Sequence, residues 1–110
     1  MKVHLIKRET IEDYIRDHAR SRPSFEEWLE KIKRADWQMP GDIMETFNSA
    51  DLLGRGCHRV VFNIAGNNFR MIAKYWFGAS RVHLYIKWIG THAEYTLLCK
   101  NKQQYAVNEY

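Results

Sequence analysis

Acidic residues are absent from a long central part of this sequence, because no Asp or Glu occurs between Leu52 and Ala93. The basic residues of this stretch are Arg55, Arg59, Arg70, Lys74, Arg81 and Lys87. The stretch therefore carries +6, and the other 11 basic and 13 acidic residues sum to −2, within a total of +4. Such one-sided charge favours a polyanionic partner, although a solvated basic sheet face would explain it equally well. The lack of carboxylates argues against a carboxylate-bound metal site here.

Cysteine is scarce, and long apolar runs are missing. Cys57 and Cys99 are the only cysteines, which excludes a disulfide framework, and their spacing fits no metal-binding pattern. No apolar run approaches the roughly 20 residues of a membrane span, and residues 1–10 lack the apolar core of a signal peptide. We therefore expect a cytoplasmic protein with reduced thiols and no membrane association. The length predicts a single domain over residues 1–110.

Two amphipathic helices are predicted in the N-terminal third, after a short strand at residues 2–6. The first lies within residues 10–20. The second starts at Ser24, which forms a capping-box pair with Glu27, and Pro23 should help to end the first. The short link between the helices predicts an antiparallel hairpin. Residues 38–56 are predicted to be a connection that contains a helical turn.

From His58 onward, polar and apolar residues alternate, which predicts strands at 58–64, 68–77 and 81–89. Gly66-Asn67 can form the tight turn between the first two strands, because both residues tolerate positive φ. This turn places Asn63 opposite Arg70, and the next turn pairs Phe77 with Val82.

The resulting register sorts the strand residues onto two faces. One face, which we call the helix face, should receive the two helices; it comprises Val60, Phe62, Ile64, Phe69, Met71, Tyr75, Val82, Leu84, Ile86 and Trp88. The other, which we call the basic face, comprises Arg59, Asn63, Arg70, Lys74, His83, Tyr85 and Lys87. The apolar residues Val61, Ile72, Trp76 and Ile89 also fall on the basic face, and they leave room for another element to dock.

That element is predicted to be a short helix at about residues 92–99. Thr91 and Glu94 match a capping box, and Tyr95 and Leu98 lie on one side of the helix. His92 and Tyr95 lie on adjacent turns, and the helix N-terminus should favour the neutral form of His92. Most such pairs are structural when taken alone. The polar tail, residues 100–110, can be frayed or bound to a partner.

A basic face with a tyrosine and histidines suggests phosphate or RNA binding. It is also compatible with RNA cleavage by the RNA's own 2′-hydroxyl, which needs no metal. Arg and Lys would stabilise the charge on the phosphate, and His, Lys or Tyr would move the protons. The simpler alternatives stay open: Arg70 can be an exposed strand residue stacked over an aromatic ring, and Lys74 and Lys87 can be solvated strand lysines.

Two motifs resemble the HigB family of bacterial toxins, which belongs to the RelE-like superfamily. The first is F-N-x-x-G-N-x-x-R, from Phe62 to Arg70, and the second is T-H-x-E-Y, from Thr91 to Tyr95. With the two preceding helices, the likeness spans about residues 1–100. The resemblance implies an α+β, RelE-like fold: an antiparallel sheet with an N-terminal two-helix hairpin on one face, a short C-terminal helix and a basic face that takes mRNA.

The resemblance also implies a metal-independent endoribonuclease, without cofactor, that cuts translated mRNA in the ribosomal A site. A HigA-type helix-turn-helix antitoxin would be its partner. The catalytic residues implied are Arg70 for the scissile phosphate, Lys87 for charge or proton transfer, His92 as general acid or base, and Tyr95 to orient His92 or to stack on a base. The RNA-binding candidates are Arg59, Asn63, Lys74 and Tyr85. Many relatives carry Asp after the tyrosine, where this sequence has Thr96.

Two other functions use the same features. A non-catalytic RNA- or ribosome-binding module would need the basic face but no proton transfer. A degenerate toxin kept as a scaffold for a partner would need neither RNA binding nor catalysis.

Overall fold

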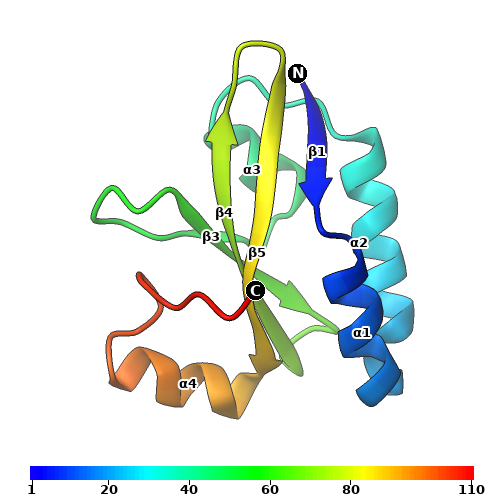
Figure 1. The fold of residues 1–110 in the computed structure, drawn as a ribbon, viewed down its shortest axis with the longest axis vertical. Coiled ribbons are helices and arrows are strands. Elements are labelled where there is room, and N and C mark those ends of the chain that lie inside the picture. Colours follow the sequence, from blue (N-terminus) through cyan, green and yellow to red (C-terminus); the bar gives the residue numbers. More distant parts are fainter.

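The computed structural model describes residues 1–110 as a five-stranded sheet with four α-helices (Figure 1). The strands are β1 (Lys2–Ile6), β2 (Asp51–Leu52), β3 (Arg59–Ile64), β4 (Phe69–Phe77) and β5 (Arg81–Thr91). The helices are α1 (Glu9–Asp17), α2 (Arg22–Arg34), α3 (Gly41–Thr46) and α4 (His92–Lys100). Every element that the alternation and helical spacing predicted is therefore present.

The sheet is mixed, which corrects the prediction of an antiparallel sheet. The strand order is β1-β5-β4-β3-β2, and β1 pairs with β5 in parallel, whereas the other neighbours are antiparallel. Tight turns oblige β3, β4 and β5 to be antiparallel. No turn links β1 to β5, because three α-helices and the other three strands lie between them in the chain, and such a connection allows a parallel pair.

The start of α2 also differs from the prediction. The helix begins at Arg22, so Pro23 lies in its first turn and Ser24 lies inside it; no side chain caps this end. Proline is well suited to the first turn of a helix, where its missing N–H would have no intrahelical acceptor. Pro23 therefore belongs to the beginning of α2, while α1 ends earlier, at Asp17.

The register of the β3–β4 hairpin is the predicted one, with Asn63 opposite Arg70. The positive φ angles fall at Ala65 (54°) and Gly66 (63°), one residue earlier than the predicted Gly66-Asn67. The second turn also has the predicted pairing, Phe77 with Val82.

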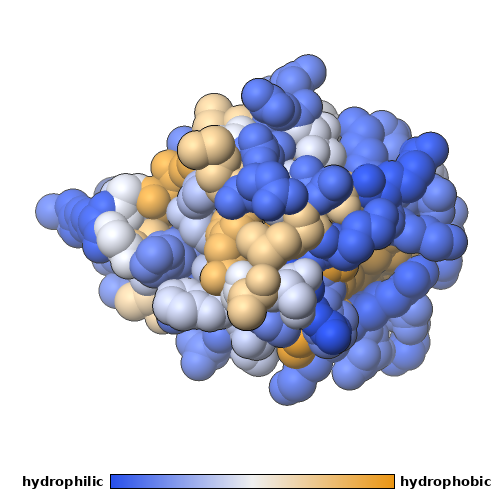
Figure 2. Space-filling model, turned by 90° about the horizontal axis from the view of Figure 1, so that it is seen from above, coloured by the Kyte–Doolittle hydropathy of each residue, from blue (hydrophilic) through white to orange (hydrophobic).

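The main core lies between the helix face and α1, α2 and α3. Its largest fully buried side chains include Phe25, Phe62, Trp37, Ile11 and Ile43. Most predicted helix-face residues are in this cluster. Figure 2 views the molecule from the end that carries the β4–β5 turn, and hydrophilic residues cover the outer side of the helices. No helix is long and apolar enough to cross a membrane.

A second, smaller core lies on the basic face. Val61, Ile72 and Trp88 are buried there under Tyr95 and Leu98 of α4. The expectation that the apolar residues of the basic face receive the C-terminal helix is confirmed for Val61 and Ile72, but Trp76 stays exposed and Ile89 lies in the main core. In Figure 1, α4 lies below the sheet on the side away from α1 and α2.

Candidate functional site

A β-bulge near the end of β5 corrects the predicted face of two residues. Trp88 was assigned to the helix face and Ile89 to the basic face. The pairing of β4 with β5 slips by one residue at Lys87, so the alternation of side chains is shifted beyond it. Trp88 therefore packs against Val61 and Ile72 on the basic face, and Ile89 joins the main core.

The cations of the basic face have no carboxylate partner. All the ion pairs in the chain lie within residues 1–36. In the sheet, Arg59 is opposite Lys74, and Lys74 is opposite Tyr85 on the other side. Since no acidic side chain neutralises these groups directly, the face keeps a positive field that would attract a polyanion.

Arg70 occupies the end of the basic face nearest α4. It is only 8% exposed, and its guanidinium donates to the side-chain oxygen of Asn67 (3.2 Å) and to the carbonyl of Phe69 (3.1 Å). On either side of it in the sheet lie Asn63 and Gly90. Two hydrogen bonds therefore hold the Arg70 guanidinium, and neither acceptor carries a charge that would neutralise it.

Tyr95 is the tyrosine that α4 brings to this end of the face. Its ring lies 6.0 Å from that of Trp88, and burial is the main reason that the pKa of its phenol is raised well above the ordinary value, an effect that the charge of Arg70 partly opposes. Tyr95 is therefore neutral at physiological pH, so its hydroxyl can donate a hydrogen bond or a proton but is not a base.

The predicted capping box at the start of α4 is present. The Glu94 amide donates to the Thr91 hydroxyl (3.2 Å), and the Thr91 amide donates to the Glu94 carboxylate (2.7 Å). The His92 amide donates to the carbonyl of Asn68, 3.0 Å away in the β3–β4 turn. The cap and this bond fix where β5 passes into α4. The His92 ring itself is exposed and has no hydrogen bond or aromatic contact.

Gly90, the last residue before this cap, is tightly enclosed. A Cβ at this position would overlap the indole ring of Trp88 and lie 3.0 Å from the Glu94 carboxylate. We expect Gly90→Ala to lower the free energy of unfolding by about 1–3 kcal/mol, the usual cost of overpacking. Urea unfolding measures it. Gly41→Ala, where a Cβ meets nothing within 4 Å, is the control. Equal stability of the two variants would show that Trp88 moves freely.

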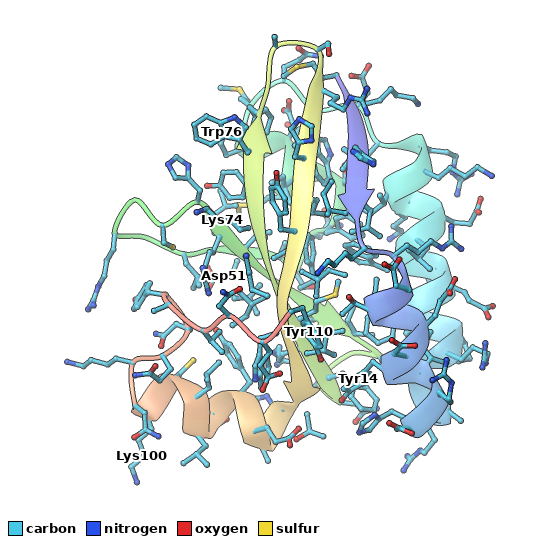
Figure 3. All side chains as sticks on the ribbon, in the orientation of Figure 1. Tyr14, Asp51, Lys74, Trp76, Lys100 and Tyr110 are labelled. Atoms are coloured by element: carbon cyan, nitrogen blue, oxygen red, sulfur yellow. The ribbon has the colours of Figure 1, made fainter.

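The C-terminal tail, residues 101–110, crosses the basic face (Figures 1 and 3). The buried Arg59 guanidinium donates to the carbonyls of Val107 (2.7 Å) and Gln104 (3.3 Å). The Lys87 ammonium donates to the Asn108 side-chain oxygen (3.2 Å). Val107 packs on the smaller core. Neutral oxygens of the tail thus bind Arg59 and Lys87, two cations that the resemblance assigned to RNA. This corrects the prediction that the tail is frayed or bound to a partner, because the tail packs on the sheet of its own chain. The apolar Val107 is the one residue of this polar segment that indicates such packing.

The eight predicted site residues fall into two groups. Arg70 and Tyr95, with Asn63 and the backbone of His92, lie at the α4 end of the basic face. Arg59, Lys74, Tyr85 and Lys87 lie in its middle. Burial, and then repulsion by Arg59 and Lys74, lowers the pKa of Lys87, in agreement with this grouping. Gly90 lies opposite Arg70 in the sheet, and Lys87 precedes Gly90 by three residues in β5. This separation corresponds to about 10 Å along β5. The two groups are therefore spaced so that both could contact phosphates of a single RNA strand.

No group of three or more His, Cys, Asp or Glu side chains is placed to hold a metal ion. Cys57 and Cys99 are both free thiols.

The fold and this site define an α+β protein whose sheet is covered by helices on one face and carries unpaired cations on the other. The sequence profile of the HigB toxins, described as the RelE-like toxic component of a toxin-antitoxin system, matches residues 21–98. The chain therefore belongs to the HigB toxin family, which implies an antitoxin partner. The match leaves out β1, α1 and the tail. A comparison with curated proteins gives no match.

Proposed function

We propose that this toxin is a ribosome-dependent endoribonuclease of a type II system, which cuts translated mRNA by attack of the RNA's 2′-hydroxyl on the adjacent phosphate. The observation that supports this most directly is the pair of Arg70 and Tyr95 at the end of a basic face whose cations form no ion pair. A buried guanidinium can stabilise the negative charge that develops on the phosphate. A RelE-like toxin family is consistent with a ribonuclease.

Proton transfer in this reaction is assigned to His92 and Tyr95. His92 is exposed at the N-terminus of α4 and its ring makes no hydrogen bond within the protein, so the imidazole is free to accept the 2′-hydroxyl proton. Tyr95 keeps its proton, because burial raises its pKa, and can donate it toward the leaving 5′ oxygen or hold a phosphate oxygen.

Lys87 would contact the RNA backbone beside Arg70. For this, its hydrogen bond to Asn108 must be exchanged for one to a phosphate. A hydrogen bond between the ammonium and a phosphate joins two ionised groups, whereas the Asn108 oxygen is neutral, so bound RNA can displace this contact. The partner is proposed to be a HigA-type helix-turn-helix antitoxin, and the substrate to be mRNA in the ribosomal A site.

We expect His92→Ala to reduce cleavage by about 10²- to 10⁴-fold, the usual contribution of one acid–base group. Primer extension on mRNA from translating ribosomes would detect new 5′ ends made by the parent and their loss in the variant. His4→Ala is the matched control, since His4 is also exposed but lies on the edge strand β1. Undiminished cleavage by a folded His92→Ala variant would remove His92 from the mechanism.

The same assay separates cleavage from binding alone. If the parent protein binds translating ribosomes and yields no new mRNA ends, the basic face serves a non-catalytic RNA- or ribosome-binding module. New ends that depend on Arg70 and His92 support the enzyme.

A further inference from the structure

One aromatic side chain on the basic face has no role in the proposed reaction. Trp76 is 55% exposed, whereas the other three tryptophans, Trp28, Trp37 and Trp88, are at most 6% exposed. Tryptophan is usually well buried, and its exposure on a sheet is typical of a binding surface. Figure 3 shows Trp76 and Lys74 along β4, on the side away from α1 and α2.

The surroundings of Trp76 combine aromatic rings with positive charge. An open hollow of about 400 Å³ is lined by Lys74, Trp76, Tyr85 and Lys87. Tyr85 is 37% exposed, and the ammonium of Lys87 lies 5.7 Å from the centre of its ring. The volume is sufficient for one nucleotide, since sites for small ligands begin at about 300 Å³.

We propose that this hollow is a nucleobase-stacking site for single-stranded RNA, in which one base stacks on Trp76 and the flanking phosphates contact Lys74 and Lys87. Aromatic platforms between cations are how proteins hold single strands without reading their sequence. Trp76 lies six residues from Arg70 on the same strand, about 20 Å away. The site would therefore hold a nucleotide several positions from the scissile phosphate and would set affinity rather than chemistry.

The combination of positive charge and aromatic rings favours RNA over a segment of the antitoxin as the occupant. Neither lysine of the hollow has an ion-pair partner, and the nearest parts of β4 and β5 contain no acidic residue. A single strand supplies a base for the ring and a phosphate for each lysine. The inference rests on the proposal that RNA is the ligand of the basic face, but it does not require that the RNA be cut.

The test is fluorescence titration of the full-length protein with a short 2′-O-methyl oligoadenylate, which cannot undergo 2′-hydroxyl attack. Because Trp76 is the only exposed tryptophan, we expect bound RNA to quench its emission. Trp76→Ala, followed by anisotropy of labelled RNA, should raise Kd about 5- to 150-fold, the loss of one base–aromatic stack. Trp76→Phe should recover part of the affinity.

Two controls make the result specific. An abasic oligonucleotide with the same number of phosphates should bind the parent and Trp76→Ala equally. Leu97→Ala, which removes an exposed apolar side chain (60% exposed) from α4, should leave the Kd unchanged. Circular dichroism confirms that each variant is folded.

Three outcomes would overturn the inference. Trp76→Ala could bind oligoadenylate as tightly as the parent. The variant could also lose as much affinity for the abasic strand as it loses for oligoadenylate, which would show that Trp76 does not stack on a base. It could also bind RNA normally but lose affinity for the antitoxin, and Trp76 would then belong to that interface. A failure of the cleavage proposal is recognised separately, because the parent protein would then yield no new mRNA ends in primer extension, while the oligoadenylate titrations would keep their meaning.

Discussion

Replacing Arg70 by alanine is expected to lower the rate of RNA cleavage by about 10²- to 10³-fold and to relieve growth arrest. This is the usual cost of removing one group that stabilises charge in the transition state. Arg70 is the buried cation nearest α4, and all its hydrogen bonds go to neutral oxygens, so its charge is available to a phosphate. Primer extension gives the rate, and colony growth after induction gives the toxicity.

The interpretation depends on separating chemistry from folding, because Arg70 also holds Asn67 in the β3–β4 turn. Arg70→Lys keeps the charge but not the two-pronged geometry of the guanidinium, so an intermediate rate is expected. Arg81→Ala is the matched control: it removes the same charge from an exposed position at the far end of β5. If a folded Arg70→Ala protein cleaves as fast as Arg81→Ala, the phosphate is held elsewhere.

Replacing Phe62 by alanine is expected to lower the free energy of unfolding by about 3–5 kcal/mol, the range for a buried phenylalanine. Phe62 is 1% exposed at the centre of the main core. Its ring packs edge-to-face on Trp28 (5.2 Å) and Phe47 (5.0 Å), so its removal leaves a cavity between the sheet and the helices. Because many domains are stable by only about 5–15 kcal/mol, this loss is a large fraction of the total stability, and the variant should be less toxic to cells at 37 °C than the parent.

Chemical denaturation followed by tryptophan fluorescence measures this loss, since Trp28 and Trp37 report on the same core. The surface variant Leu97→Ala provides the reference and should stay within about 0.5 kcal/mol of the parent. A Phe62→Ala protein as stable as that reference would mean that the helices close onto the sheet and fill the space.

Much of the sheet could be predicted from local patterns. Alternation placed Val60, Phe62 and Ile64 on the helix face, and the short turn at residues 65–68 placed Asn63 opposite Arg70. Both inferences depend only on neighbours in the chain. The capping box of α4 was equally local, because Thr91 and Glu94 are three residues apart.

Predictions that depended on distant parts of the chain were less successful. The bulge at Lys87 reverses the faces of Trp88 and Ile89, and nothing in the alternation of β5 indicates it. The bulge lets Trp88 fill the smaller core beneath α4. Likewise, Pro23 was predicted to help end the first helix, but it lies in the first turn of α2. Starting α2 at Arg22 goes together with the burial of Phe25 and Trp28 in the main core, which no local pattern specifies.

The sequence by itself determined the helices and the strands β1, β3, β4 and β5, the two faces of β3 and β4, the absence of acidic residues from β3, β4 and β5, and the position of the α4 cap. These follow from backbone geometry and from the period of the side chains, which act over a few residues. Tertiary structure alone decided that β1 joins β5 in parallel, that the tail binds Arg59 and Lys87, and that Trp76 stays exposed. Each of these depends on contacts between segments far apart in the chain, whose geometry no local pattern specifies.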